Sequence, residues 1–127
     1  MKRIRSLRKN ESGATALQFA LTAPLFIALL FGVVEIGIAL WTQFGLQYGV
    51  AAAARCAAID TVTCDNAADI ASYAANNALG LTIPSSAFTI ADASCGHQIT
   101  GTYVYTFFTG YFGTPTETLH AQACYPT

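Results

Sequence analysis

The strongest constraint on this chain is the stretch from Ser12 to Val34, which has no charged residue and reads SGATALQFALTAPLFIALLFGVV. An α-helix needs about 20 predominantly apolar residues to cross the hydrocarbon core of a bilayer, and this stretch is long enough. Pro24 is its one helix-breaking residue. Because membrane helices tolerate proline, we expect a kink there and not an end. The stretch therefore predicts a membrane-spanning helix.

The charges around this stretch predict its orientation. Of the six Lys and Arg residues, five precede it: Lys2, Arg3, Arg5, Arg8 and Lys9. Such a basic head stays on the cytoplasmic side of the membrane, which leaves the C-terminal part outside. Arg55 is the only basic residue after the head, so no nucleic-acid-binding surface is expected. With 54% hydrophobic and 10% charged residues, an intrinsically disordered chain is excluded.

A removable signal peptide is the alternative to a membrane anchor. The apolar region of a signal peptide usually has only about 7–15 residues, fewer than are found here. The small residues from Ala51 to Ala54 are nevertheless of the kind that a signal peptidase accepts. A retained anchor is the favoured interpretation, and a small secreted protein with a removed signal remains open.

Helix-forming residues continue beyond the apolar stretch. Glu35 is followed by IGIALWTQFGLQYGVAAAARCAA, which contains no proline, so we expect one helix from Ala14 to about Ala58. Its second half has aromatic residues at i, i+3 and i+7 and glutamines on another face: Trp41, Phe44 and Tyr48, and Gln43 and Gln47. This amphipathic half should lie against a small domain or against neighbouring helices. Gly45 and Gly49 have the GxxxG spacing, which has low specificity outside a membrane span.

The N-terminal part of the chain resembles a known family. Basic residues, then ESGATALQFALTAPLFIALLFGVVEIGIAL, then a helix rich in aromatic and small residues are similar to TadE-like proteins, the minor pilins or pseudopilins of the tight-adherence (Flp) pilus. The family pattern is a glycine and a small residue, E-F-A-x-x-x-P, and an apolar run ending in E-x-G, matched here at Gly13, Phe19, Ala20, Pro24, Glu35 and Gly37. The resemblance covers Arg8 to about Cys56, and FFTGYFGTPTETLHAQACYP is similar to the family's closing strands.

This resemblance implies cleavage by a prepilin peptidase. The family is cut after a glycine on the cytoplasmic side, so the cut would fall after Gly13 and Ala14 would be the first mature residue. The fifth mature residue is then Gln18, where the family has a glutamate that is thought to neutralise a neighbouring subunit's N-terminal amine. Glutamine accepts a hydrogen bond but carries no charge, so a buried amine beside it would stay unpaired.

The resemblance implies that Gln18, Pro24 and Glu35 are assembly residues. Along a helix with a rise of ~1.5 Å per residue, Glu35 lies about 32 Å from Ala14. That distance places Glu35 near the outer membrane interface. We expect an interfacial carboxylate there, in preference to a buried functional acid.

The C-terminal half of the sequence predicts a small α+β domain. NAADIASYAANNAL reads as a short helix capped by Asp65 and ended by Gly80. β-branched and aromatic residues then predict three strands, near Phe88–Ser94, Gln98–Phe108 and Glu117–Tyr125. We expect a long helix packed on a short helix and a three-stranded antiparallel sheet. The chain would thus have a cytoplasmic leader, a long helix that spans the membrane in its first half, and an extracytoplasmic domain: residues 1–13, 14–58 and 59–127.

All four cysteines lie on the outer side of the predicted span, at Cys56, Cys64, Cys95 and Cys124. An even number in a small extracytoplasmic domain predicts two disulfides, and Cys56 should pair with Cys64 across a short loop. In a simple meander, Cys95 and Cys124 would end strands about 9.6 Å apart, whereas a disulfide needs Cα atoms within about 7 Å. A bend at Cys95, adjacent first and third strands, or a different pairing would each resolve this conflict. The cysteines form no CxxC pair, so no metal site is expected.

No catalytic constellation is recognisable in the sequence. His97 and His120 are the only histidines, and neither belongs to a motif with a nucleophile and an acid. We therefore expect no enzyme activity and no cofactor. An aromatic run should form sheet core and loop cover, with a contact surface for another pilin or a host as the alternative: Tyr103, Tyr105, Phe107, Phe108, Tyr111 and Phe112.

These observations favour a structural role, as a membrane-inserted minor pilin or pseudopilin of a tight-adherence pilus. The expected partners are other pilins, the pilus assembly platform, the prepilin peptidase and the membrane. The protein would cross the bacterial inner membrane once, with its N-terminus in the cytoplasm and its C-terminal domain in the periplasm, or enter an extracellular pilus. A singly anchored binding module that never polymerises is the second interpretation.

Overall fold

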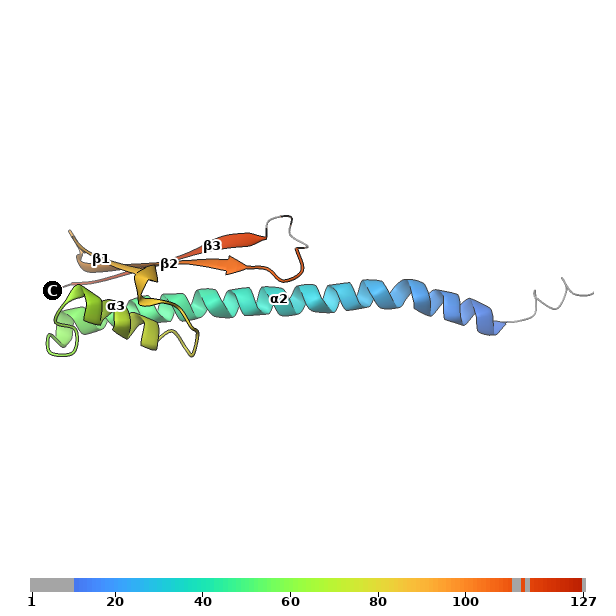
Figure 1. Ribbon diagram of the computed structural model, residues 1–127, viewed down its shortest axis with the longest axis horizontal. Helices are drawn as coiled ribbons and strands as arrows, with labels where there is room; N and C mark the ends of the chain where they lie inside the picture. Colours follow the sequence, from blue (N-terminus) through green and yellow to red (C-terminus); the bar gives the residue numbers. More distant parts are fainter. Residues whose placement is uncertain (1–10, 111–112, 114, 127) are drawn as a thin grey trace, which may run out of the picture. The chain divides into compact units, whose positions relative to one another are not determined.

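The computed structural model describes residues 11–110, 113 and 115–126, with side chains from Gly13 onward. Of the predicted leader, residues 1–13, the first ten residues lie outside the described ranges. The elements in chain order form the expected α+β fold (Figure 1): α2 (Glu11–Ile59), α3 (Ala67–Asn76), the 3₁₀ helix η1 (Ser85–Ala87), β1 (Phe88–Ala93), β2 (Gly96–Thr106) and β3 (Thr116–Tyr125). The chain divides into two compact units, one ending at Val34 and the other beginning at Glu35.

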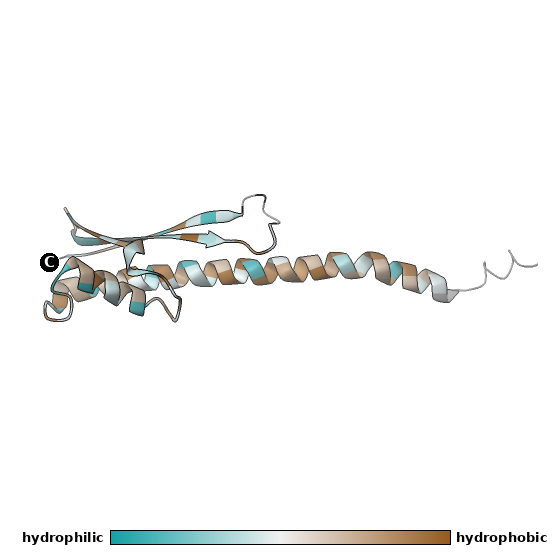
Figure 2. Ribbon diagram, in the orientation of Figure 1, coloured by the Kyte–Doolittle hydropathy of each residue, from teal (hydrophilic) through white to brown (hydrophobic). Residues whose placement is uncertain are grey.

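In the first unit, α2 exposes apolar side chains around its whole circumference. None of the described side chains from Gly13 to Val34 is buried, and apolar colours predominate along α2 in Figure 2. Pro24 lies inside the helix, so it does not end it, as predicted. The helix is long and apolar enough to cross a membrane. Side chains of this kind, exposed on every face, are typical of a helix surrounded by lipid or by other helices.

In the second unit, the remainder of α2 forms the core of a small domain. Leu46 and Val50 have no exposed surface and lie against β2. A Cβ atom added at Gly101 of β2 would lie 2.9 Å from a side-chain carbon of each of them. A side chain at position 101 would therefore push the sheet away from the helix, and glycine allows the two to pack closely.

Glutamine side chains join the same part of α2 to the edge of the sheet. The strand order is β1-β2-β3, so β3 is an edge strand with backbone groups that no further strand satisfies. Gln43 Nε2 donates to the carbonyl of His120 at 2.8 Å, and Gln47 Nε2 donates to that of Gln122 at 3.2 Å. The two glutamines thus cover the edge of β3 and fix its register against the helix.

The second helix, α3, packs against α2 at two glycines. A Cβ at Gly45 would lie 2.9 Å from the carbonyl oxygen of Ala78, and one at Gly49 would lie 2.6 Å from that of Ala74. The GxxxG spacing therefore serves close packing within this chain. The N-cap of α3 is Asn66 and not the predicted Asp65, because the Asn66 side chain accepts from the N–H groups of Ala68 and Asp69.

The strands pair in an antiparallel meander, close to the predicted ranges. Ile99 of β2 lies between Ile90 of β1 and Ala123 of β3 and has no exposed surface. Phe88 and Ala121 are also buried on the side that faces the helices. The inner face of the sheet, α3 and the second half of α2 therefore share one core.

Two disulfides close the small domain of the second unit, which is called the outer domain below after its predicted location. Cys56 pairs with Cys64, as predicted, with a Cα–Cα distance of 6.0 Å. Cys95 pairs with Cys124 at 6.2 Å, although β1 and β3 flank β2. The geometric conflict disappears because Cys95 lies in the turn between β1 and β2. Gly96 makes this bend possible with a φ of +115°, and a Cβ there would collide with the carbonyl oxygen of Tyr125.

Loss of the two disulfides should affect stability unequally. The bonds span sequence separations of 8 and 29 residues. The loop-entropy relation predicts about 2.6 kcal/mol for Cys56–Cys64 and about 3.6 kcal/mol for Cys95–Cys124. Paired Cys→Ser variants, unfolded thermally in detergent, should show the larger loss for Cys95 and Cys124. Peptide mapping without reduction that linked Cys56 to Cys95 or Cys124 would contradict the structure.

Gly49 should be essential for the packing of α3. Gly49→Ala should destabilise the outer domain, because the added methyl group would meet a backbone carbonyl that cannot rotate away. Gly37→Ala is the matched control, since a Cβ there has nothing within 4 Å and alanine favours a helix by about 1 kcal/mol over glycine. Thermal unfolding followed by circular dichroism should give a lower Tm for the first variant only. Equal responses would refute the contact.

Candidate functional site

The face of α2 that points away from the sheet and α3 is uncovered in the second unit. Trp41, Phe44 and Tyr48, here called the aromatic stripe, are 54%, 59% and 49% exposed. The amphipathic second half of α2 lies against a small domain, as predicted. It contacts the sheet through the face that carries Gln43 and Gln47. Leu46, Val50 and other small or aliphatic residues fill the space beneath the sheet, and the larger rings remain outside. An exposed apolar stripe of this kind is typical of a protein-contact surface.

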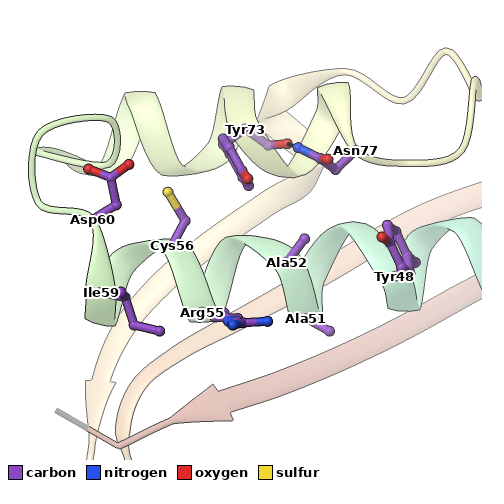
Figure 3. Close-up of a pocket in the computed structure, with 9 residues that line it drawn as sticks. All are labelled: Tyr48, Ala51, Ala52, Arg55, Cys56, Ile59, Asp60, Tyr73 and Asn77. Carbon is purple, nitrogen blue, oxygen red and sulfur yellow. Dashed lines mark hydrogen bonds between the residues drawn. The ribbon is translucent and has the colours of Figure 1, made fainter.

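A groove of about 510 Å³ lies at the end of the same helix face (Figure 3). Most of its lining comes from the end of α2, with Tyr73 contributed by α3 and Asn77 by the C-cap of α3: Tyr48, Ala51, Ala52, Arg55, Cys56, Ile59, Asp60, Tyr73 and Asn77. Arg55 is exposed and has no ion-pair partner among the described residues. The groove thus combines aromatic surface with one available cation.

Asp60 closes the groove at the end of α2. Its carboxylate accepts hydrogen bonds from the Thr63 hydroxyl at 2.7 Å and from the N–H groups of Thr63 and Val62 at 3.1 and 3.2 Å. These bonds, the Thr63 hydroxyl foremost, lower the pKa of Asp60 below its ordinary value. Asp60 therefore holds the turn that carries the chain to Cys64.

Glu35 is the one acidic side chain that the described structure buries. Only 3% of it is exposed, so its carboxylate is buried against the chain itself, while its expected place at the outer membrane interface stays a prediction. One carboxylate oxygen accepts from the N–H of Phe108 and from that of Thr109, the latter at 3.1 Å. The other oxygen accepts from the Thr109 hydroxyl. Glu35 thus ties the connection between β2 and β3 to α2, a contact that sequence spacing does not reveal.

A second, smaller groove begins directly after Glu35 in α2. It has a volume of about 270 Å³ and is lined by Ile36, Ala39, Leu40, Gln43, Tyr105, Phe107, Glu117 and Leu119. Phe107 packs edge-on against Tyr105, with ring centroids 5.1 Å apart. Burial, followed by the nearby Glu35 charge, raises the pKa of Tyr105. The predicted aromatic run is therefore partly core, at Tyr105, and partly exposed, at Phe108, while Tyr111 and Phe112 lie outside the described residues.

The N-terminal candidates lie on the exposed first part of α2. A Cβ at Gly13 would meet nothing within 4 Å, so no local packing demands glycine there. Ala14, Gln18 and Pro24 have exposed side chains, and the carbonyl of Gln18 accepts from the Thr22 hydroxyl at 3.0 Å. Cleavage after Gly13 and assembly through Gln18, Pro24 and Glu35 stay predictions.

The remaining polar residues show pairing without a reactive arrangement. His97 Nδ1 lies 2.8 Å from Asp92 Oδ1, and His120 Nδ1 lies 3.5 Å from the Thr102 hydroxyl. All four cysteines are in disulfides. Within the described ranges, no group of three or more His, Cys, Asp or Glu side chains could hold a metal ion.

Comparison with known proteins gives a match that lies within α2. The family model described as TadE-like protein matches residues 13–55, which confirms the resemblance seen in the sequence. TadE-like proteins are a structural, pilus-associated family, and the match covers 43 of the 127 residues of this chain. No curated protein and no solved structure matches the chain.

Removal of the Glu35 charge should loosen the loop that it holds. Glu35→Gln keeps the shape of the side chain, but its amide nitrogen would face hydrogen-bond donors and leave at least one of them unsatisfied. We expect a lower Tm in detergent and faster amide exchange at Phe108 and Thr109. Glu117→Gln removes the same charge at an exposed position and should leave both observables unchanged. Identical behaviour of the two variants would contradict the proposed contact.

Proposed function

We propose that the protein is a membrane-inserted minor pilin or pseudopilin that takes part in the assembly of a tight-adherence pilus. The observation that carries this proposal is the dual character of α2. Its TadE-like segment begins as an exposed apolar helix and continues as the core of a disulfide-bonded domain. A prepilin peptidase would cut between Gly13 and Ala14, and the protein would remain in the inner membrane with its outer domain in the periplasm.

The core argues against removal of the N-terminal segment as a signal peptide. A cut within residues 51–54 would separate Leu46 and Val50 from the domain, although both are fully buried in it. Ala53 and Ala54, beside the cut, are also buried. The loss of these side chains would leave a cavity and expose apolar surface, each of which costs several kcal/mol in comparable cores. The anchored interpretation has no such cost.

The outer domain favours association with a different protein over association with itself. From Glu35 onward the chain has six acidic residues and one basic residue, a formal charge of −5 with neutral histidines. Identical domains of this charge repel one another at low ionic strength. The aromatic stripe supplies an apolar contact surface for the helix of another pilin, and Arg55 is available to an acidic group on that partner. We therefore propose a minor component that joins other pilins or the assembly platform.

Processing provides the first test. Gly13→Leu should leave a precursor about 1.4 kDa heavier than the mature protein, about one tenth of the 13.4 kDa chain. Gly32→Leu is the matched control, because Gly32 also has nothing within 4 Å of an added Cβ but lies away from the proposed cut. Mass spectrometry of protein isolated from membranes should find the precursor for the first variant only. A Gly13 variant that matures to the wild-type mass would refute the cleavage site.

Gln18 provides the second test. A filament of this chain alone would leave the amine of every Ala14 without the glutamate that the family usually supplies, and an uncompensated buried charge costs several kcal/mol. Purified mature protein should therefore form no long filaments in electron micrographs. Gln18→Glu should leave membrane insertion unchanged and increase co-purification of tagged and untagged copies. Long filaments of the wild-type protein alone would contradict the proposal of a minor component.

A further inference from the structure

The connection between β2 and β3 carries an apolar side chain that the described chain leaves uncovered. Phe108 is 85% exposed, more than any other described aromatic side chain given as exposed. Its backbone is nevertheless held firmly, because the N–H groups of Phe108 and Thr109 donate to the Glu35 carboxylate. An exposed ring on a backbone held in this way indicates a surface kept in position for contact.

Glu35 also fixes where this ring lies along the protein. Glu35 directly follows the uncharged stretch that ends at Val34, so in an anchored protein it marks the end of the hydrocarbon core. The sheet extends away from that level, since Gln43 contacts His120 and Gln47 contacts Gln122 further along α2. Phe108 therefore lies at the end of the sheet that is nearest to Glu35, the first residue after the uncharged stretch.

The surroundings of Phe108 suit the boundary between lipid and water. Ile36 and Leu40 are 45% and 64% exposed and line the smaller groove together with Phe107. The charge of Glu35 would be costly beside lipid, but both of its oxygens accept hydrogen bonds from the loop. Trp and Tyr are enriched at membrane interfaces, and Phe is found on the apolar faces of interfacial helices, where it is buried at the boundary between headgroups and acyl chains.

We propose that the Phe107–Thr109 tip is a second membrane contact, in which Phe108 inserts its ring into the outer interface of the bilayer that α2 spans. This inference rests on the proposed membrane anchor, but not on the pilin role. The contact would fix the rotation and the height of the outer domain relative to the membrane. The Glu35 hydrogen bonds place the tip, and the exposed Ile36 and Leu40 extend the apolar surface beside it.

Tryptophan fluorescence tests the contact in the full chain. Phe108→Trp is combined with Trp41→Phe, so that position 108 carries the only tryptophan, and the protein is reconstituted in vesicles of phosphatidylethanolamine and phosphatidylglycerol. Its emission should shift to the blue and lose intensity when the acyl chains are brominated. Val104→Trp in the same background is the control, because Val104 is 56% exposed and lies on the order of 13 Å further along the strand. It should emit as in water and resist quenching.

Further measurements separate the possible outcomes. Thr109→Val, which removes one hydrogen bond to Glu35, should reduce the quenching of the position-108 tryptophan. Resistance of the protein to alkaline extraction from membranes tests the anchor independently. An anchored protein whose position-108 tryptophan emits as in water, with or without brominated lipid, would overturn the membrane contact. So would a blue shift that appears only after another pilin is added, since the tip would then be a protein-binding surface.

Discussion

The close packing of α2 on β2 at Gly101 is the contact on which the outer domain depends. Leu46 and Val50 fill the space that the missing side chain of Gly101 leaves, and both are completely buried. The same helix begins with the TadE-like apolar segment. The proposed anchor and the core are therefore parts of one helix, α2 (Glu11–Ile59). Because the second half of α2 supplies these core side chains, the domain needs that half of the helix in order to fold.

The elements that depend on local sequence could be predicted from it. Uninterrupted helix formers specified the extent of α2, and β-branched and aromatic residues specified the three strands. The short loop between Cys56 and Cys64 made that disulfide predictable, because little chain entropy opposes its closure. For such features, the interacting residues are neighbours in the sequence.

The contacts between distant segments could not be predicted in the same way. Glu35 is buried by residues 73 and 74 positions away, and nothing in its own helix indicates those partners. Periodicity separated the aromatic from the glutamine face of α2, but it did not show that the edge of β3 needs donors, which Gln43 and Gln47 supply. The bond between Cys95 and Cys124 depends on a turn at Gly96 that a regular meander does not include.

We propose different surroundings for successive parts of α2: lipid up to Val34, the small domain from Glu35 onward, and a partner on the exposed aromatic face. N-terminal sequencing of the protein isolated from its own membrane tests this proposal most directly. We expect a chain that begins at Ala14 and retains the whole helix from there. A chain that still begins at Met1 would contradict the pilin role, and one that begins near Arg55 would contradict the membrane anchor itself.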